Sequence, residues 1–98
     1  MSGGDWKEMF TAIQQGDKAL VEYYLKAGID PNYQHPEYLA APLVESIRFG
    51  HLEIAQLIIE HGGDPHIKEV WGGETPLSVA KVKKDKAAVK LLEQYLKA

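Results

Sequence analysis

One spacing of 34 positions recurs along this chain and constrains its fold more than any other feature. It separates four pairs of landmarks: Gly16 from Gly50, Gly28 from Gly62, Asp30-Pro31 from Asp64-Pro65, and Ala41-Pro42-Leu43 from Thr75-Pro76-Leu77. A spacing shared by turn glycines, a loop dipeptide and a helix-opening proline is the signature of an internal repeat. In a repeat protein each unit buries its apolar face against the next unit. The sequence therefore predicts about three stacked units.

The composition argues against several functional classes. The 98 residues carry a net charge of −3, which argues against a general attraction to nucleic acid or to an anionic membrane. Cysteine is absent, so a disulfide framework, a thiol nucleophile and a cysteine zinc site are excluded. No apolar run approaches the length of a membrane span, and the first ten residues lack the features of a secretory signal. We therefore expect a cytoplasmic protein that has neither a membrane nor a nucleic-acid partner.

Each unit is expected to hold two short helices joined by a tight turn. Pro42 and Pro76 suit the first turn of a helix, where the missing N–H costs nothing. Aspartate and threonine are good helix caps, because their side chains accept hydrogen bonds from unpaired backbone N–H groups. Three helices are expected over 18–26, 42–49 and 52–60. A further helix is expected to begin with a capping box at Asp5 and Glu8 and to end at Gly16. In the third unit, one helix is expected to begin at Thr75 and Pro76, and the other is expected to be capped by Asp85.

The connections between the units are expected to be long and non-helical. Pro31 and Pro36 rule out a helix over 29–41, which is the first connection. Residues 70–74 form a second non-helical loop, which carries Trp71. Lys84 stands where the earlier units have a turn glycine. A lysine in a left-handed turn costs on the order of 1 kcal/mol. We therefore predict a strained or reshaped turn at Lys84.

These residues together resemble the ankyrin-repeat family, whose unit has a T-P-L opening, a G-H turn, a helix of L-E-I-V-x-L-L type and a G-A-D-x-N exit. Here the middle unit reads A-P-L, then G-H-L-E-I-A-Q-L-I-I, then G-G-D-P-H. The first unit ends in G-I-D-P-N and the third opens with T-P-L-S-V-A. The resemblance extends from about Trp6 to Leu96. It implies an all-α solenoid of three helix-turn-helix units joined by extended hairpin-like fingers, in a single domain over 1–98 with units at about 5–33, 39–67 and 73–98.

Two departures from the family pattern stand out. The family's period is about 33 residues, so each finger here is one residue longer. Val44 and Ser78 occupy the place of the family's histidine after T-P-L, which removes the hydrogen bonds that this histidine makes between repeats. The first and last units lack parts of the pattern, as terminal caps with a polar outer face would.

The resemblance implies a non-enzymatic protein–protein interaction module, without a cofactor, that binds another protein through its concave face and finger loops. Tyrosine, tryptophan and arginine at such positions suit an interface, because they offer large contact areas or a planar donor fork. The positions that face partners in this family are Glu37, Tyr38 and Ala40 in the first finger, Trp71 and Glu74 in the second, and Gln14, Gln15, Arg48, Phe49, Val82 and Lys83 at the ends of the inner helices. The alternative is that Trp71 folds back on its finger and Phe49 packs between repeats. We expect the domain to be monomeric on its own.

Other functional readings stay open from the sequence. His61, Asp64 and His66 lie close together and could hold a metal or small ligand, or serve a small enzyme, although two of them fall on the exit turn, where aspartate serves the backbone. The serines lack a nucleophile-elbow context. The basic run over 81–86 is interpreted as a solvated face of the last unit, with contact to an acidic partner or nucleic acid as the alternative. A structural or regulatory subunit of a larger assembly is a further alternative.

Overall fold

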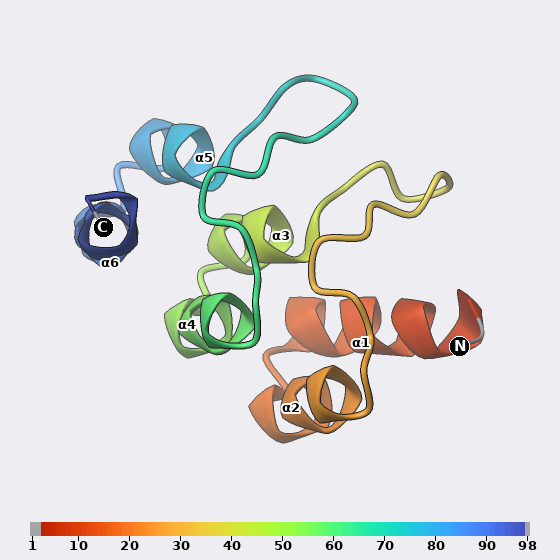
Figure 1. Cartoon of the computed structure of the whole chain (residues 1–98). Coiled ribbons are helices and arrows are strands. Elements are labelled where there is room, and N and C mark those ends of the chain that lie inside the picture. Colours follow the sequence, from red (N-terminus) through yellow and green to blue (C-terminus); the bar gives the residue numbers. More distant parts are fainter. Residues whose placement is uncertain (1–2, 98) are drawn as a thin grey trace.

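The computed structural model describes residues 3–97, which form six helices and no strand. The helices are α1 (Gly3–Gln15), α2 (Lys18–Lys26), α3 (Pro42–Arg48), α4 (Leu52–Glu60), α5 (Pro76–Val82) and α6 (Lys86–Leu96). They form two layers, one of α1, α3 and α5 and the other of α2, α4 and α6 (Figure 1). The fold is therefore an all-α stack of three helix pairs, which confirms the predicted fold class.

Most of the predicted helix starts are confirmed by their caps. Asp17 accepts a hydrogen bond from the Leu20 backbone N–H, and Asp85 accepts one from the Ala88 N–H. Thr75 forms a capping box with Ser78, whose hydroxyl oxygen accepts the Thr75 backbone N–H at 2.8 Å. These bonds satisfy N–H groups that the first helical turn leaves without a partner.

The predicted capping box at Asp5 is wrong. Helix α1 begins at Gly3, which places Asp5 inside the first turn and not at the cap. A carboxylate is favoured in both places, because the positive end of the helix dipole extends over the whole first turn. The sequence pattern therefore could not separate the two positions.

The turn at the end of the first helix of each unit has a left-handed residue. Gly16 and Gly50 have φ of +77° and +78°, and Lys84 takes the equivalent place with φ of +57°. The strained turn predicted at Lys84 is therefore confirmed. The Lys84 N–H still donates to the Lys81 carbonyl at 3.0 Å, so the turn keeps its shape although its residue has changed.

Replacing Lys84 with glycine is expected to stabilise the domain by about 0.5–1 kcal/mol. Glycine removes the steric penalty of the left-handed conformation, and this gain exceeds the extra entropy that glycine gives the unfolded chain. Thermal unfolding followed by circular dichroism should show a melting temperature that rises by a few degrees. Lys81→Gly, inside α5 at ordinary helical φ and ψ, serves as the control and should lower the melting temperature. A decrease in both variants would contradict the strain argument.

A single apolar core runs through all three helix pairs, from Trp6 in α1 to Leu92 in α6. Ile47 in α3 and Ile13 in α1 occupy equivalent repeat positions, and both have no exposed surface. The third residue in this series is Lys81, which is exposed. No helix among residues 3–97 is both long and apolar enough to cross a membrane.

Candidate functional site

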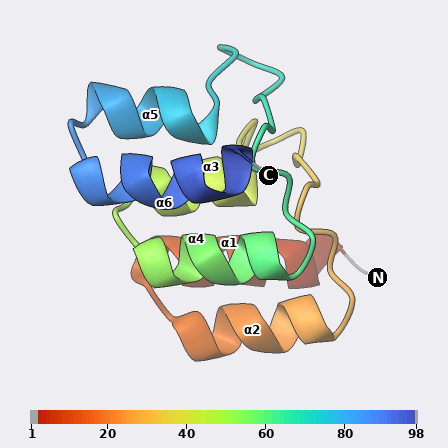
Figure 2. The ribbon, with the colours of Figure 1, turned by 60° about the vertical axis from the view of Figure 1, so that its left-hand side comes forward.

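Two long loops project from the layer of α1, α3 and α5 and lie at the same end of the helices (Figures 1 and 2). We call them finger 1 (residues 30–41) and finger 2 (residues 64–75). Two amide side chains of finger 1 join them. Asn32 donates to the Gly62 carbonyl at 3.1 Å and accepts from the Asp64 N–H at 2.8 Å, while Gln34 donates to the Lys68 carbonyl at 3.0 Å and accepts from the Val70 N–H at 2.9 Å. The fingers are therefore held in a fixed register.

Finger 1 is anchored to α1 by a cluster of aromatic rings. Trp6 lies at its centre and is 3% exposed. Its ring stacks on Phe10 at 4.9 Å, on His35 at 5.2 Å and on Tyr38 at 5.6 Å between centroids. Tyr38 also stacks on Phe10, yet stays 41% exposed. It therefore contributes both to the anchoring of the finger and to its surface.

Finger 2 is anchored at its base by a buried ion network. Glu69 is 4% exposed, accepts from the Ala41 N–H at 3.0 Å and pairs with Arg48 at 2.8 Å. The other terminal nitrogen of the guanidinium, Arg48 Nη1, lies 2.5 Å from Glu45 Oε1, and Glu45 is 6% exposed. Gln14 completes the network by donating to Glu45 at 2.7 Å. One guanidinium thus joins α3 to finger 2, and an amide joins α1 to α3.

The pKa of Arg48 reflects this network. Burial acts to lower the pKa, but the hydrogen bonds to Glu69 and Glu45 outweigh burial, so the net shift is upward. Arg48 therefore stays charged and compensates two buried carboxylates. Its guanidinium holds the fold together and is only partly available to a partner.

Three of the residues predicted to bind a partner are exposed apolar side chains. The exposed fraction is 47% for Phe49, 67% for Trp71 and 80% for Val82. Trp71 does not fold back on its finger, and Phe49 is not buried between repeats, so the structure decides against the alternative for both. Val70 beside Trp71 is 77% exposed. No aromatic ring among the described residues stacks on Trp71 or Phe49.

Most polar members of the predicted set have intramolecular contacts. Glu37 pairs with Lys7 across 3.2 Å at the surface, and Glu74 accepts from the Ser78 hydroxyl at 2.8 Å. Lys83 donates to the Arg48 carbonyl at 2.6 Å and the Ile47 carbonyl at 3.1 Å, so it closes the end of α3. Gln15 is exposed.

Ala40 is 7% exposed and belongs to the core. It offers a partner little surface and is left out of the surface proposed below. The sequence pattern placed it on the finger but did not show that the finger turns inward just before α3.

The two fingers enclose a hollow of about 280 Å³. Its lining is mostly apolar and consists of Gln34, His35, Pro36, Leu39, Val70 and Trp71. Leu39 has φ of +54°, an unusual conformation for a leucine, and is 40% exposed. The hollow therefore leaves a mostly apolar surface open between the two fingers.

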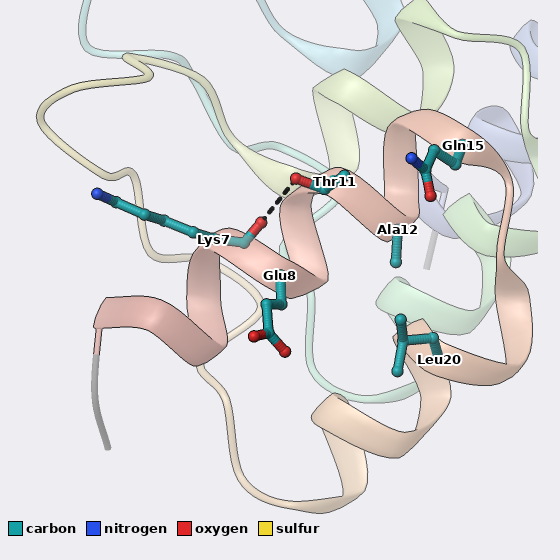
Figure 3. Close-up of a pocket in the computed structure, with 6 residues that line it drawn as sticks. All are labelled: Lys7, Glu8, Thr11, Ala12, Gln15 and Leu20. Atoms are coloured by element: carbon teal, nitrogen blue, oxygen red, sulfur yellow. Dashed lines mark hydrogen bonds between the residues drawn. The ribbon is translucent and has the colours of Figure 1, made fainter.

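A second hollow, of about 340 Å³, lies between α1 and α2 in the first helix pair (Figure 3). Glu8, Ala12 and Leu20 line it, while Lys7 extends away from it (Figure 3). The Glu8 carboxylate accepts a short hydrogen bond from the Tyr24 hydroxyl, which raises the pKa of Tyr24 to about 12. Desolvation and the Glu8 charge act in the same direction. The carboxylate is thus used in joining the two helices.

The histidine and aspartate side chains of the second exit turn serve the local backbone. The Asp64 carboxylate accepts from the His66 N–H at 2.8 Å, and His61 Nδ1 lies 3.0 Å from the Leu57 carbonyl. Within residues 3–97 no three histidine, aspartate or glutamate side chains converge on a point where a metal could bind. The geometry gives the metal alternative no support.

Several residues that shape this site could not be found by sequence reasoning. In the sequence, nothing distinguishes Asn32 and Gln34 from other polar loop residues. Their hydrogen bonds to finger 2 depend on the positions of the two fingers in the folded chain. Glu45 and Glu69 read as ordinary surface carboxylates. The one available signal is that Glu45 falls on a short helix in which four of the six other residues are apolar.

The finger architecture and the three helix pairs agree with the comparison to known families. Residues 9–97 match the family described as ankyrin repeats in three copies. This chain belongs to the ankyrin-repeat family. The resemblance to ankyrin repeats inferred from the sequence is therefore confirmed. Ankyrin repeats are generally protein-interaction modules.

Several curated proteins are similar to this chain over most of its length. The 2-5A-dependent ribonuclease of Mus musculus is 34% identical over 76 residues, which cover 78% of this chain and 10% of the ribonuclease. An ankyrin repeat-containing protein of Schizosaccharomyces pombe is 32% identical over 87 residues, covering 89% of this chain and 40% of that protein. The ARF GTPase-activating protein Git of Drosophila melanogaster is 29% identical over 75 residues, 10% of its length. This chain thus corresponds to a minor part of each.

Proposed function

We propose that this ankyrin-repeat domain is a non-enzymatic protein-binding module. Its partner contacts the fingers and the exposed ends of α1, α3 and α5. The observation that carries the proposal is the exposure of Phe49, Trp71 and Val82, three apolar side chains that contribute nothing to the core. Large aromatic side chains contribute most to interface energies, because they bury much area and lose little rotamer freedom.

The polar contacts of the fingers support this proposal by lowering the entropic cost of binding. Both fingers are already held in place in the absence of a partner. The contacts that hold them are the side-chain hydrogen bonds of Asn32 and Gln34 and the ion pair between Arg48 and Glu69. A loop that is already ordered loses less conformational entropy when it is bound. The hollow beside Trp71 then receives an apolar side chain of the partner.

The relatives limit how far the function can be extended. The names of the mouse and fruit-fly proteins describe a ribonuclease and a GTPase-activating protein, but the match covers 10% of each. We therefore infer that the shared property is the repeat scaffold, and we transfer neither activity to this chain.

Loss of Trp71 and Phe49 is expected to abolish partner capture without unfolding the domain. The test is affinity capture from a lysate of the source cells, with bound proteins quantified for the wild-type domain and for the Trp71→Ala, Phe49→Ala double variant. We expect at least one protein whose capture falls by about tenfold or more. Tyr38 is left unchanged because it stacks on Trp6 and Phe10. A substitution of Tyr38 would therefore change the stability of the domain as well as partner binding.

A matched control changes exposed apolar residues of the other layer. Leu20 and Tyr23 on α2 are 37% and 64% exposed, so Leu20→Ala, Tyr23→Ala removes a similar kind of surface away from the fingers. This variant should retain the partners. If all three proteins melt at similar temperatures and capture the same set, Trp71 and Phe49 do not belong to the binding surface.

A further inference from the structure

Four lysines surround a hollow of about 380 Å³ at the turn between α5 and α6. The lining residues are Lys81, Lys84, Lys86, Val89, Lys90 and Glu93. Within residues 3–97, none of these four lysines forms an ion pair. Val89 is partly buried and forms an apolar floor. The turn lies at the end of the helices opposite the fingers (Figure 2).

Comparison of equivalent repeat positions shows that this charge is specific to the third unit. At the positions of the four lysines, the first unit has Ile13, Gly16, Lys18 and Glu22, and the second unit has Ile47, Gly50, Leu52 and Gln56. With Glu93, which lines the same hollow, and its equivalents Ile59 and Leu25 included, the formal charge is zero in the first and second units and +3 in the third. An uncovered face needs polar residues of any kind, so solvation alone does not explain four cations in a chain with more acidic than basic residues.

Two of the lysines occupy locally unfavourable positions. Lys84 is held at φ of +57°, where the other units have glycine. Lys86 is the first residue of α6, where the positive end of the helix dipole repels a cation. Residues kept in unfavourable conformations are concentrated at functional sites. Both lysines add to the positive potential over the same hollow.

The first unit shows how a lysine at the position of Lys86 is compensated within the stack. Lys18 lies 3.8 Å from Glu53, a carboxylate at the start of α4 in the next unit. Lys86 has no such carboxylate among residues 3–97. A further repeat of the same kind would also bury Lys81, whose counterparts Ile13 and Ile47 are fully covered. A repeat packed there would therefore leave the Lys81 ammonium buried without a partner.

We propose that this face, which we call the lysine face, binds an acidic segment of a partner protein, with one apolar side chain placed on Val89. Complementary charge selects such a partner and accelerates its association. A protein segment is favoured over nucleic acid because the lining contains no aromatic side chain for base stacking and the chain as a whole is acidic. None of these residues is among the three apolar residues that carry the proposed function, although Val82 directly follows Lys81 at the end of α5.

The test uses a fluorescein-labelled peptide of glutamates around one central leucine, titrated with the whole chain at low salt and followed by fluorescence anisotropy. We expect saturable binding that weakens as salt is raised, since salt screens exposed charges. The variant Lys81→Gln, Lys84→Gln, Lys86→Gln, Lys90→Gln should lose about tenfold or more in affinity. A peptide with alanine for leucine should bind more weakly, because the Val89 floor is then left uncovered.

The control variant removes the same charge elsewhere. Lys7→Gln, Lys18→Gln, Lys26→Gln, Lys68→Gln changes lysines outside the lysine face and should reduce affinity by less than about threefold. Equal losses in the two variants, or no binding by the wild-type chain, would mean that the face is only a solvated cap and would overturn the proposal. Binding of a single-stranded oligonucleotide in place of the peptide would overturn it as well. The Trp71→Ala, Phe49→Ala variant should bind the peptide normally, which separates this test from the test of the proposed function.

Discussion

Replacing Ile47 with lysine is expected to destabilise the domain by about 4 kcal/mol or more, which is enough to unfold many domains of this size. Ile47 has no exposed surface and lies in the short helix α3, and this helix packs against α1, α4 and α5. A lysine there would carry an ammonium group into an apolar core. An uncompensated buried charge costs several kcal/mol even after the surroundings relax.

The measurement is urea unfolding followed by circular dichroism, with Lys81→Ile as the matched control. Lys81 holds the same repeat position as Ile47 but is exposed, so exchanging it for isoleucine should change the free energy of unfolding by less than about 1 kcal/mol. The two reciprocal substitutions would then differ several-fold in effect. A mild effect of Ile47→Lys would show that the middle unit is covered less completely than the structure shows.

Replacing Arg48 with methionine is expected to cost about 3 kcal/mol, because it removes the only cation paired with Glu45 and Glu69 in the described structure. Both carboxylates are more than nine-tenths buried. Methionine preserves much of the side-chain length, so the loss reports mainly on charge and hydrogen bonding. Thermal unfolding should show a melting temperature lower by roughly 10–20 °C.

A triple variant that removes all three charges tests whether unpaired buried charge causes the loss of stability. Arg48→Met combined with Glu45→Gln and Glu69→Gln removes the buried charges together, while each glutamine keeps an oxygen that can accept from Gln14 or from the Ala41 N–H. The triple variant should recover more than half of the lost stability, since the penalty comes from charges left without a partner. If Arg48→Met alone costs less than about 1 kcal/mol, the network is solvated and adds little to the anchoring of finger 2.

This network changes how binding data on Arg48 variants should be interpreted. The sequence placed Arg48 among the residues that contact a partner. The structure shows its guanidinium in contact with α3 and finger 2 of its own chain. Loss of binding in an Arg48 variant would therefore reflect a misplaced finger as readily as a lost contact, and must be compared with the melting temperature.

The repeat, the helices and most of their caps could be predicted from the sequence, because each depends on local chemistry. Helices α2 and α4 have the predicted bounds, and α3 differs by one residue. Asp17 and Thr75 cap helices through residues three positions away, and glycine is favoured in a left-handed turn whatever surrounds it. The strain at Lys84 was predictable for the same reason.

The tertiary structure alone decided which residues are covered, joined or left free. Ile47 and Lys81 share a repeat position, yet only the first has a neighbouring unit packed over it. Asn32 and Glu69 acquire their roles from residues about 30 positions away in the chain, which no local pattern encodes. Burial and long-range pairing are properties of the assembled stack, and so is the exposure of Trp71 that supports the proposed binding surface.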